Sequence, residues 1–255
     1  MNSFKAYLWK ELIEAFRSKR LIIFGIAFLF FAMVDPIMIK ILPEILKAQM
    51  GNADPESFGF SATQISALST YAKDMFQTLS IVVALTLMGL TASEIKNNTI
   101  ILPKIVGLKM SGFIISKIII YSVFISTITI IGFMVSFIYS GLLFPNSQTV
   151  TLLNTFLSSL LFSVHFIYLT ALCILFGSIS KNNVLAGILT LVTSYAGALF
   201  PMLFPKFKMY FPYYIIESAS SFKPDFNSLK SVIITLIIVV MLCFISINRL
   251  NKSES

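Results

Sequence analysis

Charged residues are scarce in this sequence. Of its 255 residues only 12% are charged, whereas 57% are hydrophobic, and the mean hydropathy is +0.89. A soluble domain carries roughly 25% charged residues, so this composition excludes a water-soluble enzyme. We therefore expect the chain to lie within a lipid bilayer.

Cysteine and histidine are also rare, with two Cys and one His in the whole chain. Cys173 and Cys243 lie in apolar stretches, where cysteine acts as a small buried apolar residue. No disulfide framework or metal site is therefore indicated. The P-loop pattern G-x-x-x-x-G-K-[ST], the metalloprotease pattern H-E-x-x-H and the nucleophile elbow G-x-S-x-G are absent. We expect that this chain is not an enzyme by itself and holds no cofactor or metal.

Six long apolar stretches take up most of the sequence. Five of them are near or above the ~18–20 residues that a spanning helix needs, and the last is slightly short. The predicted transmembrane helices cover residues 21–39, 75–93, 113–139, 152–178, 184–204 and 231–247. The first stretch has no small-residue cleavage site after it, so we expect an uncleaved anchor rather than a signal peptide. The prediction is an all-α membrane domain over residues 21–255, with outer loops 40–74 and 205–230.

The net charge of +8 is not interpreted as a nucleic-acid signal, because the basic residues follow the positive-inside rule. If the N-terminus is cytoplasmic, twelve of the 19 Lys and Arg residues fall in inner segments and seven in outer loops. We therefore predict that both termini are cytoplasmic.

An amphipathic pattern precedes the first span, within residues 1–20. Phe4, Leu8, Leu12 and Phe16 recur at every fourth position, and basic residues occupy other faces. This spacing indicates a helix that lies in the membrane interface. The alternative is an ordinary basic flank before the first span, but the regularity of the spacing favours the interfacial helix.

The inner loop over residues 94–112 reads EIKNNTIILPKIVGLKMSG and is the most distinctive segment outside the predicted spans. Its ends are polar and its middle is apolar. A cytoplasmic loop with so much apolar surface needs something to bury it against. The loop either forms a short helix that lies on lipid or docks a soluble partner.

Ionisable residues at membrane depth mark functional sites by default, and Asp35, His165 and Glu94 qualify. Asp35 is interpreted first as an interfacial residue that reaches water or caps the following helix. His165 is interpreted first as a neutral side chain that bonds across a helix pair, helped by Ser163 or Thr170; it could also line a polar pathway or carry a proton. Glu94 ends the second span. No pair of carboxylates lies within one predicted span.

Residues 94–117 resemble the membrane subunits of ABC-2 type exporters. That family commonly shows a Glu at the inner end of its second span, then a Gly-Thr pair, a leucine-rich helical segment and a Gly-Lys pair that opens the third span. The corresponding residues here are Glu94, Asn98, Thr99, the apolar segment 100–106 and Lys117. Asn98 and Ser116 stand where the family has glycine. The layout is similar as well, with a basic amphipathic "elbow" helix before six spans.

The resemblance implies a permease that pairs with a second copy or a paralogue, and with a separate ATPase subunit that binds ATP and Mg. The loop 94–112 would dock on that ATPase as a coupling helix, and the elbow helix would touch it too. The implied ATPase-coupling residues are Glu94, Asn98, Thr99, Ile101, Leu102, Lys104, Ile105, Leu108 and Lys117, and the implied elbow contacts are Lys10, Glu11 and Arg17. The expected location is the plasma membrane of a bacterium.

Two functions stay open. The first is an ABC exporter for amphipathic or hydrophobic cargo, such as a peptide, an antibiotic or a lipid-like molecule. The second is an ATP-independent protein, either a secondary transporter or a sensor or immunity protein that sequesters a peptide. A proton- or sodium-driven carrier needs paired ionisable groups at mid-membrane, and the sequence offers only His165 there. The scarcity of intramembrane charge therefore favours the exporter.

Overall fold

The computed structural model describes residues 3–50, 61–105, 107, 109–147, 149–223 and 225–252. These residues form helices and connecting turns, with no β-strand among them. Six helices in this part of the chain are long and apolar enough to cross a membrane. The predicted all-α class and the six candidate spans are thereby confirmed, and the structure is consistent with a multi-pass membrane protein.

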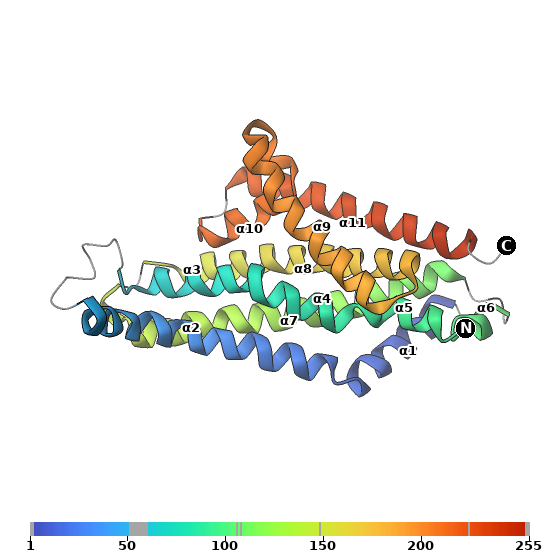
Figure 1. Ribbon diagram of the computed structural model, residues 1–255, viewed down its shortest axis with the longest axis horizontal. Coiled ribbons are helices and arrows are strands. Elements are labelled where there is room, and N and C mark those ends of the chain that lie inside the picture. The colour runs from blue at the N-terminus through green and yellow to red at the C-terminus, as the bar shows by residue number, and fades with distance from the viewer. Residues whose placement is uncertain are drawn as a thin grey trace.

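Most of the candidate spans run along the long axis of the molecule, and the fifth crosses it obliquely (Figure 1). The first, third, fourth, fifth and sixth are α2 (Arg20–Met50), α7 (Met110–Leu143), α8 (Leu152–Ser180), α9 (Asn183–Leu203) and α11 (Phe226–Lys252). The second is composed of α3 (Gln64–Asp74), the π-helix η2 (Met75–Leu79), α4 (Ser80–Leu87) and α5 (Gly89–Lys96). The shorter elements are α1 (Ser3–Arg17), α6 (Ile101–Ile105), η3 (Pro145–Ser147), η4 (Pro205–Tyr210) and α10 (Tyr213–Ser220).

The helices extend beyond the predicted spans. α2 continues through Pro36 and Pro43 to Met50, so the first part of the predicted outer loop 40–74 is helical. A proline interrupts a helix in water, but within a bundle neighbouring helices and side chains satisfy the freed backbone groups. The last part of that loop is helical too, because α3 begins after the N-cap Thr63, whose hydroxyl accepts from the N–H of Ser66.

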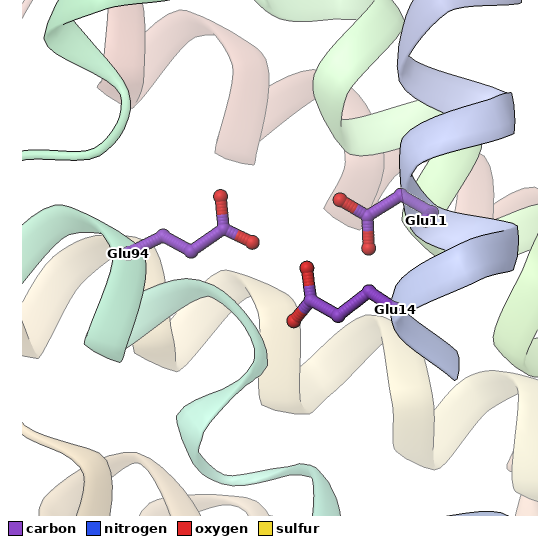
Figure 2. Close-up of side chains that lie close together, drawn as sticks. All are labelled: Glu11, Glu14 and Glu94. Atoms are coloured by element: carbon purple, nitrogen blue, oxygen red, sulfur yellow. The ribbon is translucent and has the colours of Figure 1, made fainter. Parts of the chain in front are cut away.

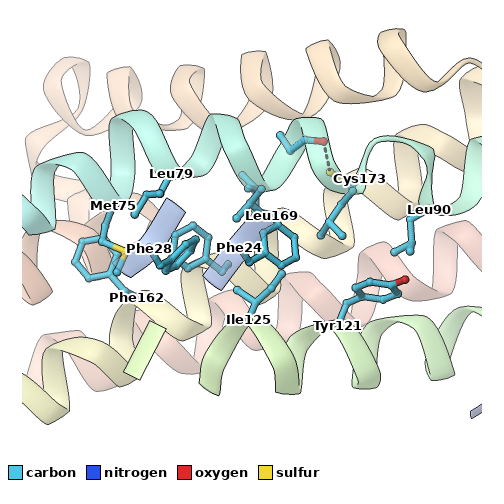
Figure 3. Close-up of a cluster of buried hydrophobic side chains, with 14 of the residues drawn as sticks. Phe24, Phe28, Met75, Leu79, Leu90, Tyr121, Ile125, Phe162, Leu169 and Cys173 are labelled. Atoms are coloured by element: carbon cyan, nitrogen blue, oxygen red, sulfur yellow. Dashed lines mark hydrogen bonds between the residues drawn. The ribbon is translucent and has the colours of Figure 1, made fainter. Parts of the chain in front are cut away.

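The core of the bundle lies around α8. Of the apolar 18-residue stretch that identifies each candidate span, 67% is buried in α8 but only 22% in α11. Aromatic and aliphatic side chains from α2, α4 and α8 pack together there, among them Phe24, Phe28, Phe162 and Leu169 (Figure 3). Lipid tails are as apolar as these side chains, so close packing rather than escape from water holds such helices together.

The N-terminal helix α1 lies against the start of α7 at one end of the bundle (Figure 1). Gly112 permits this contact, since a Cβ there would lie 3.3 Å from the backbone of Phe4. Of the apolar stripe, Phe4 and Phe16 are exposed, and Leu8 and Leu12 are partly buried against the core, whereas Tyr7 and Glu11 on the neighbouring face are buried. A carboxylate on the buried face needs a cation opposite it.

Candidate functional site

Three segments that are far apart in the sequence bring charged side chains together at the end of the bundle that carries α1, α5 and the start of α7. Figure 2 shows Glu11 and Glu14 of α1 facing Glu94 of α5. Basic side chains lie among these carboxylates. We call the following residues the charge cluster: Lys10, Glu11, Glu14, Arg20, Glu94 and Lys117.

Lys117 of α7 is the buried centre of the charge cluster, and its side chain has no exposed surface. Its Nζ donates to Oε1 of Glu11 at 2.8 Å and to Oε1 of Glu94 at 2.5 Å. The same Nζ lies 4.7 Å from the centre of the Phe113 ring. Taking an unpaired ammonium group out of water costs several kcal/mol. The two carboxylates are therefore what allows a lysine to be buried at this position.

Lys10 closes the charge cluster on the solvent side, with 44% of its side chain exposed. Its Nζ donates to Glu94 at 2.8 Å and to Glu11 at 3.3 Å, and it lies 3.6 Å from a Glu14 oxygen. Burial alone would lower the pKa of Lys10, but the Glu94 and Glu11 carboxylates outweigh it and raise the pKa. Lys10 therefore stays charged throughout the physiological range.

Arg20, the first residue of α2, links the charge cluster to the first span. One of its Nη atoms lies 3.6 Å from Glu14 Oε1 and donates to the Tyr121 hydroxyl at 2.8 Å. The cluster then holds three carboxylates and three basic side chains, so its formal charges balance. Sequence reasoning missed the roles of Glu14 and Arg20, and only the i, i+4 spacing of Lys10 and Glu14 pointed to one of them.

The carboxylates of Glu11, Glu14 and Glu94 lie close enough to raise the question of a metal ion, since one oxygen of each is within 4.8 Å of the others (Figure 2). The ammonium groups of Lys10 and Lys117 are already bound to these oxygens. A divalent cation would have to displace them or bear like-charge repulsion. We therefore interpret the charge cluster as an ion-pair junction between helices.

The turn after Glu94 is a Schellman motif, a common way to end a helix. The N–H of Asn98 donates to the carbonyl of Ile95 at 3.1 Å, and that of Thr99 to the carbonyl of Glu94 at 3.0 Å. Asn98 has a φ of 57°, in the left-handed region that glycine adopts freely and asparagine tolerates better than most residues. Asn98 therefore adopts here the left-handed conformation that a glycine would also allow.

The short helix α6 follows this turn and exposes apolar side chains. Ile101 is 45% exposed and Ile105 is 76% exposed, whereas Ile100 is buried. Residues four apart lie on one face of a helix, so α6 presents an apolar edge. For two other predicted coupling residues, Leu102 and Lys104, the side chains lie outside the described part of the structure. A third, Leu108, lies outside it entirely.

The predicted elbow contacts divide into two groups. Lys10 and Glu11 belong to the charge cluster, whereas Arg17 is exposed on α1. Arg17 lines a shallow surface depression together with Ile13 and Ser18.

Asp35 is not at a water-exposed end of the first span, which corrects our first interpretation. The residue lies within α2, which continues to Met50, and it is only 4% exposed. Its carboxyl group is within hydrogen-bonding reach of that of Asp74 in α3. Asp74 also accepts from the Thr78 hydroxyl at 3.3 Å. The sequence does not indicate this pair, because its two members lie in different helices and meet only when those helices pack together.

His165 is buried in α8 and bonds across a helix pair. Its Nε2 lies 3.3 Å from the hydroxyl of Ser80 in the second span. The predicted helpers Ser163 and Thr170 instead donate to carbonyls of their own helix. The ring packs against Phe76 of η2, with the ring centroids 5.7 Å apart. Its Nδ1 lacks a hydrogen-bond partner among the described residues.

No protein-family model matches the sequence, and a search of curated proteins returns no match.

Proposed function

We propose that this protein is the permease subunit of an ATP-driven, ABC-2 type exporter in a bacterial plasma membrane. Its cargo is amphipathic or hydrophobic, such as a peptide, an antibiotic or a lipid-like molecule. A separate ATPase subunit binds ATP and Mg, and a second permease copy or a paralogue completes the transporter. The observation that carries the proposal is the ion-pair junction of α1, α5 and α7, close in sequence to the apolar edge of α6.

The junction is suited to transmit force. Glu94 lies near the end of the second span, Lys117 near the start of the third, and Glu11 on α1. Separating a buried pair leaves an uncompensated charge, at a cost of about 3–5 kcal/mol. The three elements therefore move together. A partner that pushes on α6 displaces the ends of both spans and α1 as one body.

The exposed apolar residues of α1 support its role as an elbow helix in the membrane interface. Phe4, Trp9 and Phe16 are 40%, 63% and 66% exposed, although such side chains avoid water. A helix with its apolar side chains outward and bases nearby fits the boundary between acyl chains and headgroups. α1 and the end of α11 lie at the same end of the bundle (Figure 1), in keeping with both termini on the cytoplasmic side.

One observation favours the ATP-independent alternative. The sequence offered no paired ionisable groups within the spans, but the structure brings Asp35 and Asp74 together. A carboxyl pair between two spans is a feature of proton-driven transporters. The experiment below therefore has to separate a permease with an ATPase from a carrier without one.

The test is co-purification of the tagged full-length protein, in mild detergent, from cells that express their ATPases normally. We expect an ATPase subunit in stoichiometric amount with the unaltered protein. Ile105→Asp should abolish its recovery, because a charge in an apolar contact must be desolvated without a partner. Phe207→Asp is the matched control: Phe207 is also an exposed apolar residue, 59% exposed, but it lies in η4 after the fifth span.

Two results would count against the proposal. If the unaltered protein purifies without an ATPase, the permease function is wrong and the carrier becomes the better hypothesis. If Ile105→Asp retains the ATPase as well as Phe207→Asp does, the docking edge on α6 is wrong even though the partner is right.

A further inference from the structure

The carboxyl pair of Asp35 and Asp74 has no place in the coupling mechanism proposed above. Asp35 is buried, and its Oδ2 has no hydrogen-bond partner among the described residues. Asp35 lies 15 residues beyond Arg20 in the same helix, which corresponds to about 22 Å along the helix axis. The pair is therefore remote from the charge cluster, at a depth within the ~30 Å of a bilayer's hydrocarbon core.

Within the described part of the chain no ion pair joins Asp35 or Asp74 to a basic side chain, and the nearby bases of α2, Lys40 and Lys47, are exposed. η2 and α4 contain no charged residue. The charged residue of α7 is Lys117, which is bound in the charge cluster, and α8 carries only His165, which bonds Ser80. On α3 the other titratable groups are Tyr71, whose hydroxyl donates to a backbone carbonyl, and Lys73, which is exposed.

Two ionised carboxylates in such contact cannot satisfy each other. Both are acceptors only, and like charges at this separation repel strongly in a medium of low dielectric. A single proton turns one of them into a donor and the pair into a hydrogen bond, as in the carboxyl dyads of aspartic proteases. We propose that Asp35 and Asp74 share one proton and form a proton-binding site between the first and second spans.

The backbone hydrogen-bonding pattern of the second span changes directly after Asp74. The π-helix η2 begins at the next residue, Met75, and π turns are rare elements that occur frequently at functional sites. Thr78, one turn later, donates its hydroxyl to Asp74. A change of η2 to regular α-helix would shift Asp74 relative to Asp35. Loss of the proton drives α2 and α3 apart by repulsion, and its return lets them close.

The inference goes beyond the proposed function and does not depend on it. In an ATP-driven exporter the proton would bias the arrangement of the first two spans, and in a carrier it would be the driving ion. ATPase co-purification tests the proposed function, whereas the protonation state of the pair is measured on the permease alone. A negative result for the exporter function therefore does not refute the proton-binding pair, and a negative result for the pair does not refute the exporter function.

The first experiment is infrared difference spectroscopy of the full-length protein in lipid nanodiscs, titrated between about pH 6 and 9. A protonated carboxyl group has a C=O stretching band that ionised groups lack. We expect this band at neutral pH, its loss as the pH rises, and its absence in Asp35→Asn. Glu44→Gln is the matched control, because Glu44 is an exposed carboxyl group on the same helix, and it should leave the band unchanged.

The second measurement is thermal stability over the same pH range. The folded pair binds a proton that the aspartates of an unfolded chain have released by neutral pH, so stability should fall as pH rises. Asp35→Asn should fold and abolish this dependence, because its amide donates to Asp74 without a titrating proton. Glu44→Gln should keep it.

The proposal is overturned if the band is missing throughout the titration, or if Asp35→Asn and Asp74→Asn both leave it in place. It is also overturned if sodium chloride removes the band at constant pH while choline chloride does not. The pair would then be a sodium site, at which the bound ion displaces the proton into the solution.

Discussion

The two groups of neighbouring carboxylates in this protein have opposite surroundings. In the charge cluster, three glutamates alternate with three basic side chains, and each carboxylate has a cation within 3.6 Å. Asp35 and Asp74 have each other, and among the described residues no ion pair joins either of them to a base. The balanced group joins three elements firmly and has no reason to bind a proton. The unbalanced group can satisfy itself only by taking one. Carboxylates thus form a charge-balanced junction at one end of the bundle and, on our proposal, a proton-binding pair within the spans.

The largest effect should come from unbalancing the charge cluster. Lys117→Met leaves Glu11 buried without its shortest partner, whereas Glu94 keeps Lys10. We expect the free energy of unfolding to fall by about 3–5 kcal/mol, measured by chemical denaturation of the protein in detergent.

The matched control is the double variant Glu11→Gln with Lys117→Met, which removes one charge of each sign. It should recover more than half of the lost stability, because a neutral amide costs less to bury than a carboxylate. A double variant as unstable as the single one would show that packing of the lysine chain, rather than charge balance, stabilises the junction.

A second perturbation acts on the carboxyl pair and leaves the charge cluster untouched. Gly132 leaves room for the Tyr71 hydroxyl, which donates to the Phe28 carbonyl and so holds α3 against α2. Gly132→Ala places a methyl group against that hydroxyl, and we expect a loss of about 1–3 kcal/mol from overpacking. The infrared band of the pair should change, but ATPase co-purification should not.

Tyr71→Phe tests this account when it is combined with Gly132→Ala. Removing the hydroxyl relieves the overlap, so the cost of Gly132→Ala should be less than half as large in the Tyr71→Phe background. Equal costs in the two backgrounds would show that the two residues do not interact.

The sequence predicts the spans well and the contacts between them poorly. Long apolar stretches are a local signal, so the six candidate spans could be found without a structure. That α2 runs unbroken through Pro36 was not predicted, because proline interrupts a helix in water but is accommodated within a bundle. Thr99 and Lys117 were found through resemblance to a family, and Asn98 with them, although it replaces the family's glycine.

The residues that were missed have partners far away in the sequence. Arg20 bonds Tyr121 across 101 positions, and Asp74 meets Asp35 from another helix. Asp74 was assigned to an outer loop, because the apolar stretch begins only after it. A contact between two spans depends on how the helices are rotated, and periodicity in one helix does not fix its neighbour.

A smaller effect is expected at the turn that leads from the charge cluster to α6. Asn98 is exposed and left-handed, so Asn98→Gly should change stability by a few tenths of a kcal/mol at most. Asn98→Val should cost about 1–2 kcal/mol, because a β-branched side chain clashes in that conformation. Both are measured by thermal unfolding. Equal stability of the two variants would mean that the turn is not left-handed.

The smallest effect should come from the solvent side of the charge cluster. Lys10 is 44% exposed, and exposed ion pairs contribute about 0–1 kcal/mol to stability. Lys10→Ala should therefore lower the free energy of unfolding less than Lys117→Met does. The loss should be smaller in high salt, which screens exposed charges. The neighbouring carboxylates raise the pKa of Lys10 although burial opposes them. A base whose pKa is raised by folding contributes its full stabilisation at any pH below its pKa in the unfolded chain, ~10.4. This stabilisation is lost only as the pH rises through the pKa of the folded state. Between about pH 6 and 9 Lys10→Ala should therefore lower stability by the same amount at every pH, whereas Asp35→Asn should remove the pH dependence itself. A pH-dependent effect of Lys10→Ala in that range would mean that the charge cluster also titrates, and the contrast between the two groups of carboxylates would be lost.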